Sequence, residues 1–240
     1  MANIITLTFN PCIDKSTSVD ALVPGKKLKC SAPVFEPGGG GINVARALKK
    51  IGKDATAVYP SGGYSGNFLN ILLQNETISI ITIDIKNHTR ENMIVLDKAT
   101  NVQYRFGMPG SELSEHEWEK CLQAIEENEA EYIIASGSLP SGVPEDIFGR
   151  IAAIAKKKNR KLIVDSSEAA LELALKAGVY MAKPNIGELS KLAGKEELDA
   201  IEIEPIAKQL VMNSACEIMV VSMGTAGAML VTKEEVYRVA

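Results

Sequence analysis

The stretch of sequence that decides the fold reads Glu36-Pro37-Gly38-Gly39-Gly40-Gly41-Ile42-Asn43-Val44-Ala45-Arg46. Its four glycines lead into a predicted helix, because apolar residues recur at helical spacing from Ile42 to Ile51 and Gly52 follows as a stop. Glycine lets a backbone approach a ligand closely, and N–H groups at a helix N-terminus attract anionic or oxygen-rich groups. A flexible turn is the alternative, but four glycines followed by Asn43, which can donate and accept hydrogen bonds, favour a ligand site. Neither G-K-[ST] nor G-x-G-x-x-G is present, which argues against a nucleotide-phosphate loop.

Strand-like and helix-like segments alternate on both sides of this stretch. We expect strands at 4–8, 54–58, 78–83, 132–136, 162–165, 180–183 and 218–222. We expect helices at 42–51, 66–74, 114–128 and 144–158. Three more are expected: one that ends at 177, one near 187 and one that begins at Pro205. Ser114 and Glu117 have the spacing of a capping box. This alternation is typical of a parallel sheet covered by helices.

Two stretches, 15–35 and 86–108, contain strand-like runs without helices between them. Met93 to Leu96 and Gln103 to Phe106 have the pattern of a hairpin. We therefore predict an α/β domain made of residues 1–14, 36–85 and 109–240, with a small β insert that serves as a lid or a dimerisation surface.

Composition narrows the class of protein. The 240 residues carry a net charge of -4, which argues against a nucleic-acid partner. There is no secretory signal pattern and no apolar run long enough to span a bilayer, so no membrane association is expected. The four cysteines are scattered without a C-x-x-C pair, which suggests a reducing cytoplasm without disulfides or a zinc site.

Further motifs follow in order along the chain. They are Thr6-Leu7-Thr8-Phe9-Asn10-Pro11 with Asp14, Ser136-Gly137-Ser138-Leu139-Pro140, Lys183-Pro184-Asn185-x-x-Glu188 and Val221-Ser222-Met223-Gly224-x-x-Gly227. Together with the glycine stretch they resemble, over essentially all 240 residues, the PfkB (ribokinase-like) carbohydrate kinases. Pro33-Val34-Phe35-Glu36-Pro37-Gly38 and Tyr104-Arg105-Phe106-x-Met108-Pro109-Gly110 are especially similar to the family's 6-phosphofructokinase branch. The resemblance implies a three-layer α/β/α fold with a mostly parallel sheet and a β lid.

The resemblance also implies a set of substrate-binding residues. The sugar would contact Asp14, Gly38, Gly39, Asn43 and Ser138. Lys27, Arg90 and Arg105 would surround a substrate phosphate, since guanidinium groups bind phosphate bidentately and lysine adds a point charge. Without the resemblance, a solvated turn aspartate and ordinary charges on an edge strand would account for these residues.

A second set is implied for the nucleotide. ATP would contact Lys183, Asn185, Ser222, Gly224 and Gly227, and Mg²⁺ would be organised by Asn185 and Glu188 through water. Mg²⁺ usually takes only one or two protein oxygens and keeps its waters, which suits this pair. Taken alone, N-x-x-E is commonly a helix cap, and the last three residues fit a hairpin turn.

The sequence departs from the family in one respect. The second family signature, a Gly-Ala-Gly-Asp segment, is absent, and alignment places it beyond Ala240. Its Asp is the family's general base, and its helix start stabilises the transferring phosphoryl group. We therefore expect the chain as given to have little kinase activity and to leave apolar sheet surface uncovered.

The implied function is phosphorylation of a ketohexose phosphate by ATP, with fructose 6-phosphate converted to fructose 1,6-bisphosphate in glycolysis. A 1-phosphofructokinase or a tagatose-6-phosphate kinase would share every motif. A catalytically inactive sugar-phosphate-binding protein is the alternative from another class. The family expectation for assembly is a homodimer formed through the lid.

Overall fold

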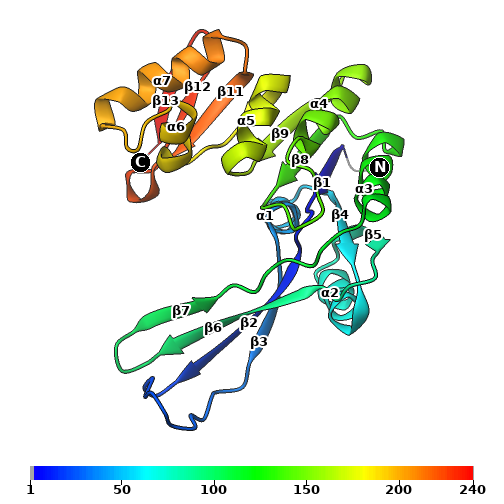
Figure 1. The fold of residues 1–240 in the computed structure, drawn as a ribbon, viewed down its shortest axis with the longest axis vertical. Helices are drawn as coiled ribbons and strands as arrows, with labels where there is room; N and C mark the ends of the chain where they lie inside the picture. Colours follow the sequence, from blue (N-terminus) through cyan, green and yellow to red (C-terminus); the bar gives the residue numbers. More distant parts are fainter. Residues whose placement is uncertain (1–2, 240) are drawn as a thin grey trace.

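A nine-stranded sheet forms the centre of the chain in the computed structural model, which describes residues 3–239 (Figure 1). Its strand order is β13-β12-β11-β10-β9-β8-β1-β4-β5, and every neighbouring pair is parallel except β11–β12 and β12–β13. Its strands are β1 (Ile4–Leu7), β4 (Thr56–Ser61), β5 (Ser79–Asp84), β8 (Tyr132–Ser136), β9 (Lys161–Asp165), β10 (Val179–Ala182), β11 (Cys216–Ser222), β12 (Ala228–Val231) and β13 (Val236–Val239). The predicted mostly parallel sheet is confirmed.

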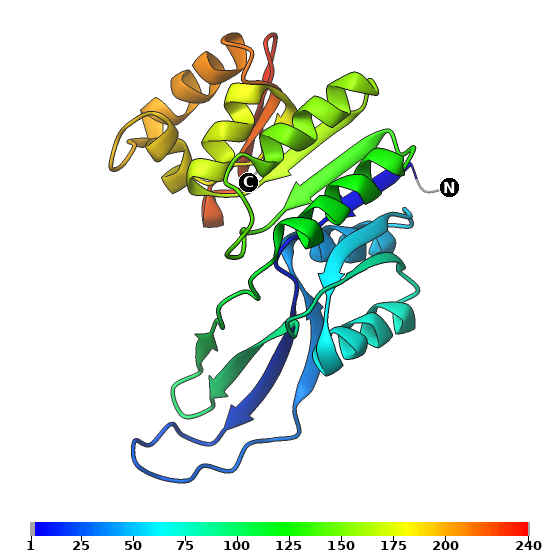
Figure 2. The same cartoon turned by 45° about the vertical axis from the view of Figure 1, so that its right-hand side comes forward.

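Helices cover this sheet on both faces (Figure 2). One layer contains α3 (Glu115–Glu127), α4 (Ile147–Lys157), α5 (Glu168–Ala177), α6 (Ile186–Leu192) and α7 (Ala200–Met212). The other contains α1 (Gly40–Lys50) and α2 (Gly63–Asn75). The three-layer α/β/α architecture is therefore present. None of the helices in residues 3–239 has the length and apolar character needed to cross a membrane.

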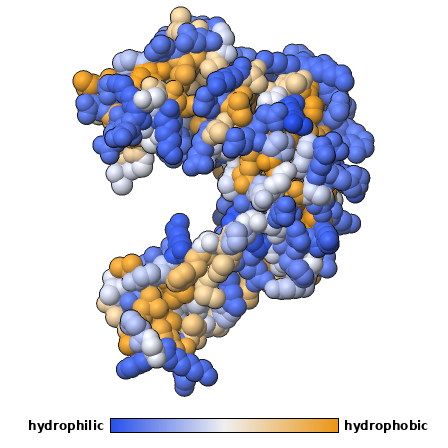
Figure 3. All heavy atoms as spheres, in the orientation of Figure 1, coloured by the Kyte–Doolittle hydropathy of each residue, from blue (hydrophilic) through white to orange (hydrophobic). Residues whose placement is uncertain are grey.

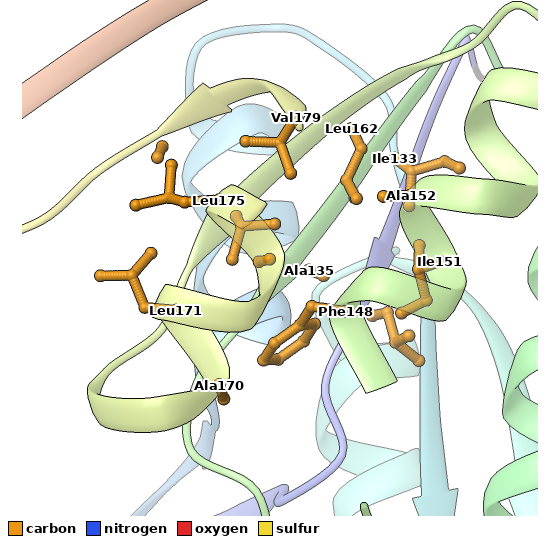
Figure 4. Close-up of a cluster of buried hydrophobic side chains, with 14 of the residues drawn as sticks. Ile133, Ala135, Phe148, Ile151, Ala152, Leu162, Ala170, Leu171, Leu175 and Val179 are labelled. Atoms are coloured by element: carbon orange, nitrogen blue, oxygen red, sulfur yellow. The ribbon is translucent and has the colours of Figure 1, made fainter. Parts of the chain in front are cut away.

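The larger apolar core lies between the sheet and the first layer. Phe148 and Ile151 of α4 point toward Ile133 and Leu162 on the sheet, and Leu171 of α5 lies beside them (Figure 4). All five side chains are at most 2% exposed, so each contributes about 1.5–3 kcal/mol by burial. This packing holds the strands that carry candidate site residues at their carboxyl ends.

The second face of the sheet is covered unevenly. In residues 3–239, α1 and α2 pack mainly over β1, β4, β5 and β8. Farther along the sheet, Ile163, Ile218 and Leu230 are partly exposed and belong to neither apolar core. These side chains are only partly exposed, so the expected uncovered apolar sheet surface stays a prediction.

A second, four-stranded sheet with the order β3-β2-β6-β7 extends from the main body (Figure 1). Its strands are β2 (Cys12–Val19), β3 (Val34–Gly38), β6 (Arg90–Asp97) and β7 (Val102–Phe106). The predicted hairpin is confirmed, since Met93 pairs with Phe106 and Leu96 with Gln103. The central pair, β2 and β6, is parallel and joins two separate excursions of the chain.

Most predicted elements occur within a few residues of their expected bounds. Tyr132–Ser136 is matched at both ends, and the capping box at Ser114 is present, with Glu117 Oε2 accepting from the Ser114 N–H at 2.7 Å. The start of the helix predicted at Pro205 is wrong, because α7 begins at Ala200 and encloses this proline. A capping box between Asp199 and Glu202 starts the helix earlier than the proline does.

Candidate functional site

Most of the candidate residues lie at one edge of the main sheet, and Lys27 and Arg105 lie farther out, in the β2–β3 connection and on the small sheet respectively. Neighbouring parallel strands end at the same edge, and there the short segment 8–11 carries the chain from β1 into β2 of the small sheet. The space-filling view shows a hollow between the small sheet and the α/β body (Figure 3). Ligands of open α/β sheets bind at the carboxyl ends of strands, so this edge is the expected position of a site.

The first two glycines of the glycine stretch pack against neighbouring strands. A Cβ atom on Gly38 would lie 2.6 Å from Asp14 Oδ2, and one on Gly39 would lie 2.7 Å from Thr8 Cγ2. Gly39 also has a φ of +116°, which side-chain-bearing residues rarely adopt. At Gly38 the absence of a Cβ atom leaves room for the Asp14 carboxylate, and at Gly39 both packing and backbone geometry favour glycine.

The other two glycines allow α1 to approach the main sheet. A Cβ atom on Gly40 would collide with Ser136 Oγ, and one on Gly41 would lie 2.7 Å from Thr8 Oγ1. The same Thr8 hydroxyl accepts a hydrogen bond from the N–H of Ile42 at 2.9 Å, so a side chain of another element caps the helix. The glycine run thus has a packing role at every position. Its predicted contacts with a ligand remain a prediction.

Asp14 lies inside β2 of the small sheet, not in a turn after the first strand. Its Oδ1 accepts hydrogen bonds from Asn92 Nδ2 at 2.9 Å and from Cys12 Sγ at 3.3 Å. Burial, followed by the charge of Asp14, raises the pKa of the Cys12 thiol to about 12, so the thiol remains a neutral donor. The Asp14 side chain is therefore held from two sides.

Arg90 connects three segments of the chain. Its Nη1 donates to the carbonyl of Met108 at 3.0 Å, and its Nη2 donates to the carbonyl of Asn10 at 3.2 Å. Asn10 Nδ2 in turn donates to Ser138 Oγ at 3.0 Å. Among residues 3–239, the buried Nε of Arg90 has no acceptor. Two of the five guanidinium N–H groups are thus used, which leaves donors for an anion.

Three other predicted substrate residues are exposed. Asn43 lies in the first turn of α1, and Lys27 lies in the connection between β2 and β3. Arg105 is paired with Ile94 across β6 and β7, which places it on the same face of the small sheet as Asn92 and Asp14. Within the described part of the chain, no hydrogen bond or ion pair joins these three side chains to Asp14 or Arg90.

The predicted nucleotide residues form a second group at the same edge. Asn185 and Glu188 make a reciprocal capping box, with both hydrogen bonds at 2.8 Å. The Ser222 N–H donates to the carbonyl of Pro184 at 3.0 Å, and Asn185 and Ser222 form an isolated parallel bridge. The structure therefore brings these two motifs side by side, although they are more than 30 residues apart.

The turn after β11 is built on glycine. Gly224 and Gly227 have φ values of +58° and +86°, and the Met223 N–H donates to the carbonyl of Gly227 at 2.8 Å. Residues 224–226 form a short 3-10 helix that joins β11 to β12. The hairpin-turn interpretation of these glycines is correct, and their contact with a nucleotide stays a prediction.

Lys183 links the two groups. Its Nζ forms an ion pair with Asp165 Oδ1 at 3.0 Å, and Asp165 Oδ2 accepts from Ser136 Oγ at 3.2 Å. Ser136 is also the residue against which Gly40 packs. A chain of contacts therefore runs from the carboxyl end of β10 to the start of α1.

Sequence reasoning missed three residues of the sugar-side network, namely Asn10, Asn92 and Met108. The strand predicted here begins only at Met93, whereas β6 begins at Arg90, and it is this earlier start that places Asn92 on the same face as Arg90. Asn10 and Met108 stand in the quoted motifs, but their partners are 80 and 18 residues distant in sequence, so the motifs do not indicate their role.

Comparison with protein families decides the class. The model of the pfkB family carbohydrate kinases matches residues 7–240. The chain belongs to this family. The predicted family and its ribokinase-like fold are thereby confirmed.

Individual relatives agree. The chain is 41% identical over 241 residues to the ATP-dependent 6-phosphofructokinase isozyme 2 of Escherichia coli (strain K12), which covers 100% of this chain and 78% of that protein. It is 31% identical to the 1-phosphofructokinase of Bacillus subtilis (strain 168), over 98% of this chain and 76% of that protein. The crystal structure of phosphofructokinase-2 from Escherichia coli in complex with fructose-6-phosphate matches with a TM-score of 0.96 and 40% identity, covering 100% of this chain and 80% of that one.

Proposed function

We propose that the chain binds fructose 6-phosphate and ATP as a pfkB-type 6-phosphofructokinase does, with phosphoryl transfer to the free primary hydroxyl of the sugar. The observation that carries the proposal is the arrangement of Asp14 and Arg90 on one face of the small sheet, at the edge of the main sheet. A carboxylate that accepts from hydroxyls and a guanidinium with free donors suit a sugar phosphate. The similar Escherichia coli protein in complex with fructose-6-phosphate supports this choice of ligand.

Different residues would contact the hydroxyls and the phosphate of the substrate. Asp14 would accept hydrogen bonds from sugar hydroxyls, beside the backbone of Gly38 and Gly39. Arg90, together with the exposed Arg105 and Lys27, would hold the substrate phosphate. Asn43 and Ser138 would contribute hydrogen bonds at the glycine edge. Binding by many fixed groups orients the reacting hydroxyl, which is the main catalytic device in phosphoryl transfer.

The nucleotide would bind along Lys183, Asn185, Ser222, Gly224 and Gly227. The capping box uses Oε2 of Glu188 and Oδ1 of Asn185, and within residues 3–239 Oε1 of Glu188 has no hydrogen-bond partner. One free oxygen fits Mg²⁺ that retains most of its waters. When bound, Mg²⁺ would neutralise charge on the nucleotide phosphates, and Glu188 would hold it through water.

The first test measures binding by calorimetry to the 240-residue chain. Fructose 6-phosphate should bind more tightly than fructose 1-phosphate and tagatose 6-phosphate, and Asp14→Ala should weaken its binding by about 10-fold to 100-fold, as expected for a hydrogen-bonded carboxylate. Lys183→Ala, as the matched control, should weaken ATP and leave the sugar unchanged. A preference for fructose 1-phosphate would instead favour 1-phosphofructokinase activity, the activity for which the similar Bacillus subtilis protein is named.

A second test separates an enzyme from an inactive binder. The Gly-Ala-Gly-Asp segment is not among these 240 residues, so we propose that they turn over slowly on their own. A chimera that joins Ala240 to that segment and the following residues of a family member should release ADP with fructose 6-phosphate. A folded chimera that binds both substrates without turnover would favour the sugar-phosphate-binding protein.

We also propose a homodimer formed through the small sheet. Val102, Tyr104 and Phe106 of β7 are 41–48% exposed, and apolar surface is visible on this sheet (Figure 3). An exposed apolar edge of this kind is a liability unless another copy covers it. Light scattering should report a dimer for the chain and a monomer for Phe106→Asp. A monomeric wild-type chain at micromolar concentration would contradict this proposal.

A further inference from the structure

Asn92 occupies a central position between the candidate sugar residues and the segment that leaves the small sheet. Its Oδ1 accepts a hydrogen bond from the backbone N–H of Met108 at 3.0 Å. Its Nδ2 donates to Asp14 Oδ1 at 2.9 Å and to Cys12 Sγ at 3.2 Å. Because a backbone N–H can only donate, the contact with Met108 fixes which amide atom faces Asp14. The hydrogen bond from Met108 thus orients the Asn92 amide so that its NH2 group faces Asp14.

Both polar groups of the Met108 backbone, its N–H and its carbonyl, are held by side chains of β6. Asn92 takes its N–H, and Arg90 donates to its carbonyl at 3.0 Å. Asn92 and Arg90 lie two residues apart on β6 and therefore project from the same face. One strand thereby ties the exit of the small sheet, at Met108, to both the candidate sugar aspartate and the candidate phosphate arginine.

The alternatives to Asn92 as a support for Asp14 are weak. Cys12 is a poorer donor, since a thiol hydrogen bond is weak and this one spans 3.3 Å. Gly38 contributes only space, because its lack of a Cβ atom admits the Asp14 carboxylate. The amide of Asn92 is therefore the strong neutral donor that directs Oδ1 and leaves Oδ2 for a ligand.

We infer that Asn92 is a positioning residue for sugar binding, which acts by holding the Asp14 carboxylate in its ligand-accepting orientation and by coupling it to the exit segment at Met108. This inference rests on the proposed function, because it assumes that Asp14 binds sugar hydroxyls. It predicts that the contribution of Asn92 to sugar affinity passes through Asp14. A residue that merely stabilises the small sheet would contribute independently of Asp14.

The experiment is a double-mutant cycle read by calorimetry with fructose 6-phosphate on the 240-residue chain. Asn92→Ala should weaken binding by about tenfold or more, the effect expected for a lost hydrogen bond to a charged group. In the Asp14→Ala background, the same change should alter affinity by less than about twofold. An equal loss in both backgrounds would show that Asn92 acts independently and would overturn the inference.

Two further variants guard against a trivial result. Asn87→Ala is the matched control. Asn87 Nδ2 also donates to the exit segment (residues 107–114), at the Glu112 carbonyl 3.0 Å away, but it makes no hydrogen bond to Asp14 in the described part of the chain. It should leave sugar affinity unchanged, and an equal loss there would overturn the inference. Asn92→Asp retains the shape and the acceptor for Met108 while placing a second carboxylate against Asp14, so it tests the same contact if Asn92→Ala does not fold. It should weaken sugar binding at least as much as the alanine variant, and unchanged binding would overturn the inference.

Failure of the proposed function gives a different result. A folded wild-type chain that binds none of the three ketohexose phosphates would remove the proposed function and the inference with it. A wild-type chain that binds fructose 6-phosphate while Asn92→Ala binds it equally well would remove the inference alone.

Discussion

The two halves of the candidate site are held together in different ways. On the nucleotide side, the contacts within each motif are local: Asn185 and Glu188 are three residues apart, and Met223 bonds to Gly227 within one turn. A backbone hydrogen bond, from Ser222 to Pro184, joins the two motifs. On the sugar side, the contacts join distant segments, as Asn92 to Asp14 across 78 residues and Asn10 to Ser138 across 128. Local motifs can therefore be interpreted from sequence, whereas the sugar side exists only after the fold has formed.

The largest expected effect probes the close packing on the sugar side. Gly41→Ala would place a methyl group 2.6 Å from the carbonyl oxygen of Leu7, inside a buried contact. We expect a loss of about 2–3 kcal/mol in the free energy of unfolding, as for other overpacked sites. Gly107→Ala, which meets no atom within 4 Å, is the control and should change stability little. Urea unfolding followed by circular dichroism measures both, and an unchanged midpoint for Gly41→Ala would show that α1 can move away from the main sheet.

Effects of intermediate size should distinguish Asn185, which caps a helix, from Asn43, which is predicted to bind sugar. Asn185→Ala removes the cap of α6 and should cost about 1 kcal/mol of stability. Asn43→Ala replaces an exposed helical residue by a better helix former, so stability should not fall, while affinity for fructose 6-phosphate should. Thermal unfolding and calorimetry on both variants give the comparison. Loss of stability in Asn43→Ala without loss of affinity would reverse these assignments.

The smallest expected effect is an absence of reaction at Cys12. This thiol is 3% exposed, and burial together with the charge of Asp14 raises its pKa to about 12. Iodoacetamide reacts with thiolates, so at pH 8 the folded chain should be labelled at the exposed Cys30 and not at Cys12. Peptide mass spectrometry identifies the labelled cysteine. Rapid labelling of Cys12 would indicate that the sugar side opens in solution and is less ordered than its hydrogen bonds suggest.

The fold was largely predictable, and physical reasons explain what was not. The strand at Tyr132–Ser136 follows from the pattern of apolar residues, and the cap at Ser114 follows from the spacing of Ser114 and Glu117, so both depend on local sequence alone. The position of Asp14 within β2 was not predicted, because strand pairing in the small sheet depends on β6, far along the sequence. The predicted start of α7 at Pro205 is too late, because the capping box of Asp199 and Glu202 starts the helix at Ala200 and the proline is accommodated inside it.

The candidate site divides in the same manner. Motif spacing brought Asn185, Glu188 and Ser222 to attention, and the structure places them together. Asn10 and Asn92 were overlooked, since each owes its role to partners that only tertiary structure supplies. The glycine stretch predicts ligand binding, and the structure adds that Gly40 and Gly41 let α1 approach the main sheet, while Gly38 makes room for Asp14.

The small sheet has a mechanical consequence. Its strands come from two excursions of the chain, so four connections cross between it and the body: residues 8–11, the junction of β3 with α1, and segments 85–89 and 107–114. Four connections restrict the orientation of the small sheet more than a single connection would. Arg90 bonds to two of these connections, at Asn10 and Met108. A rotation of the small sheet relative to the body would therefore change the hydrogen bonds of Arg90 to both segments at once.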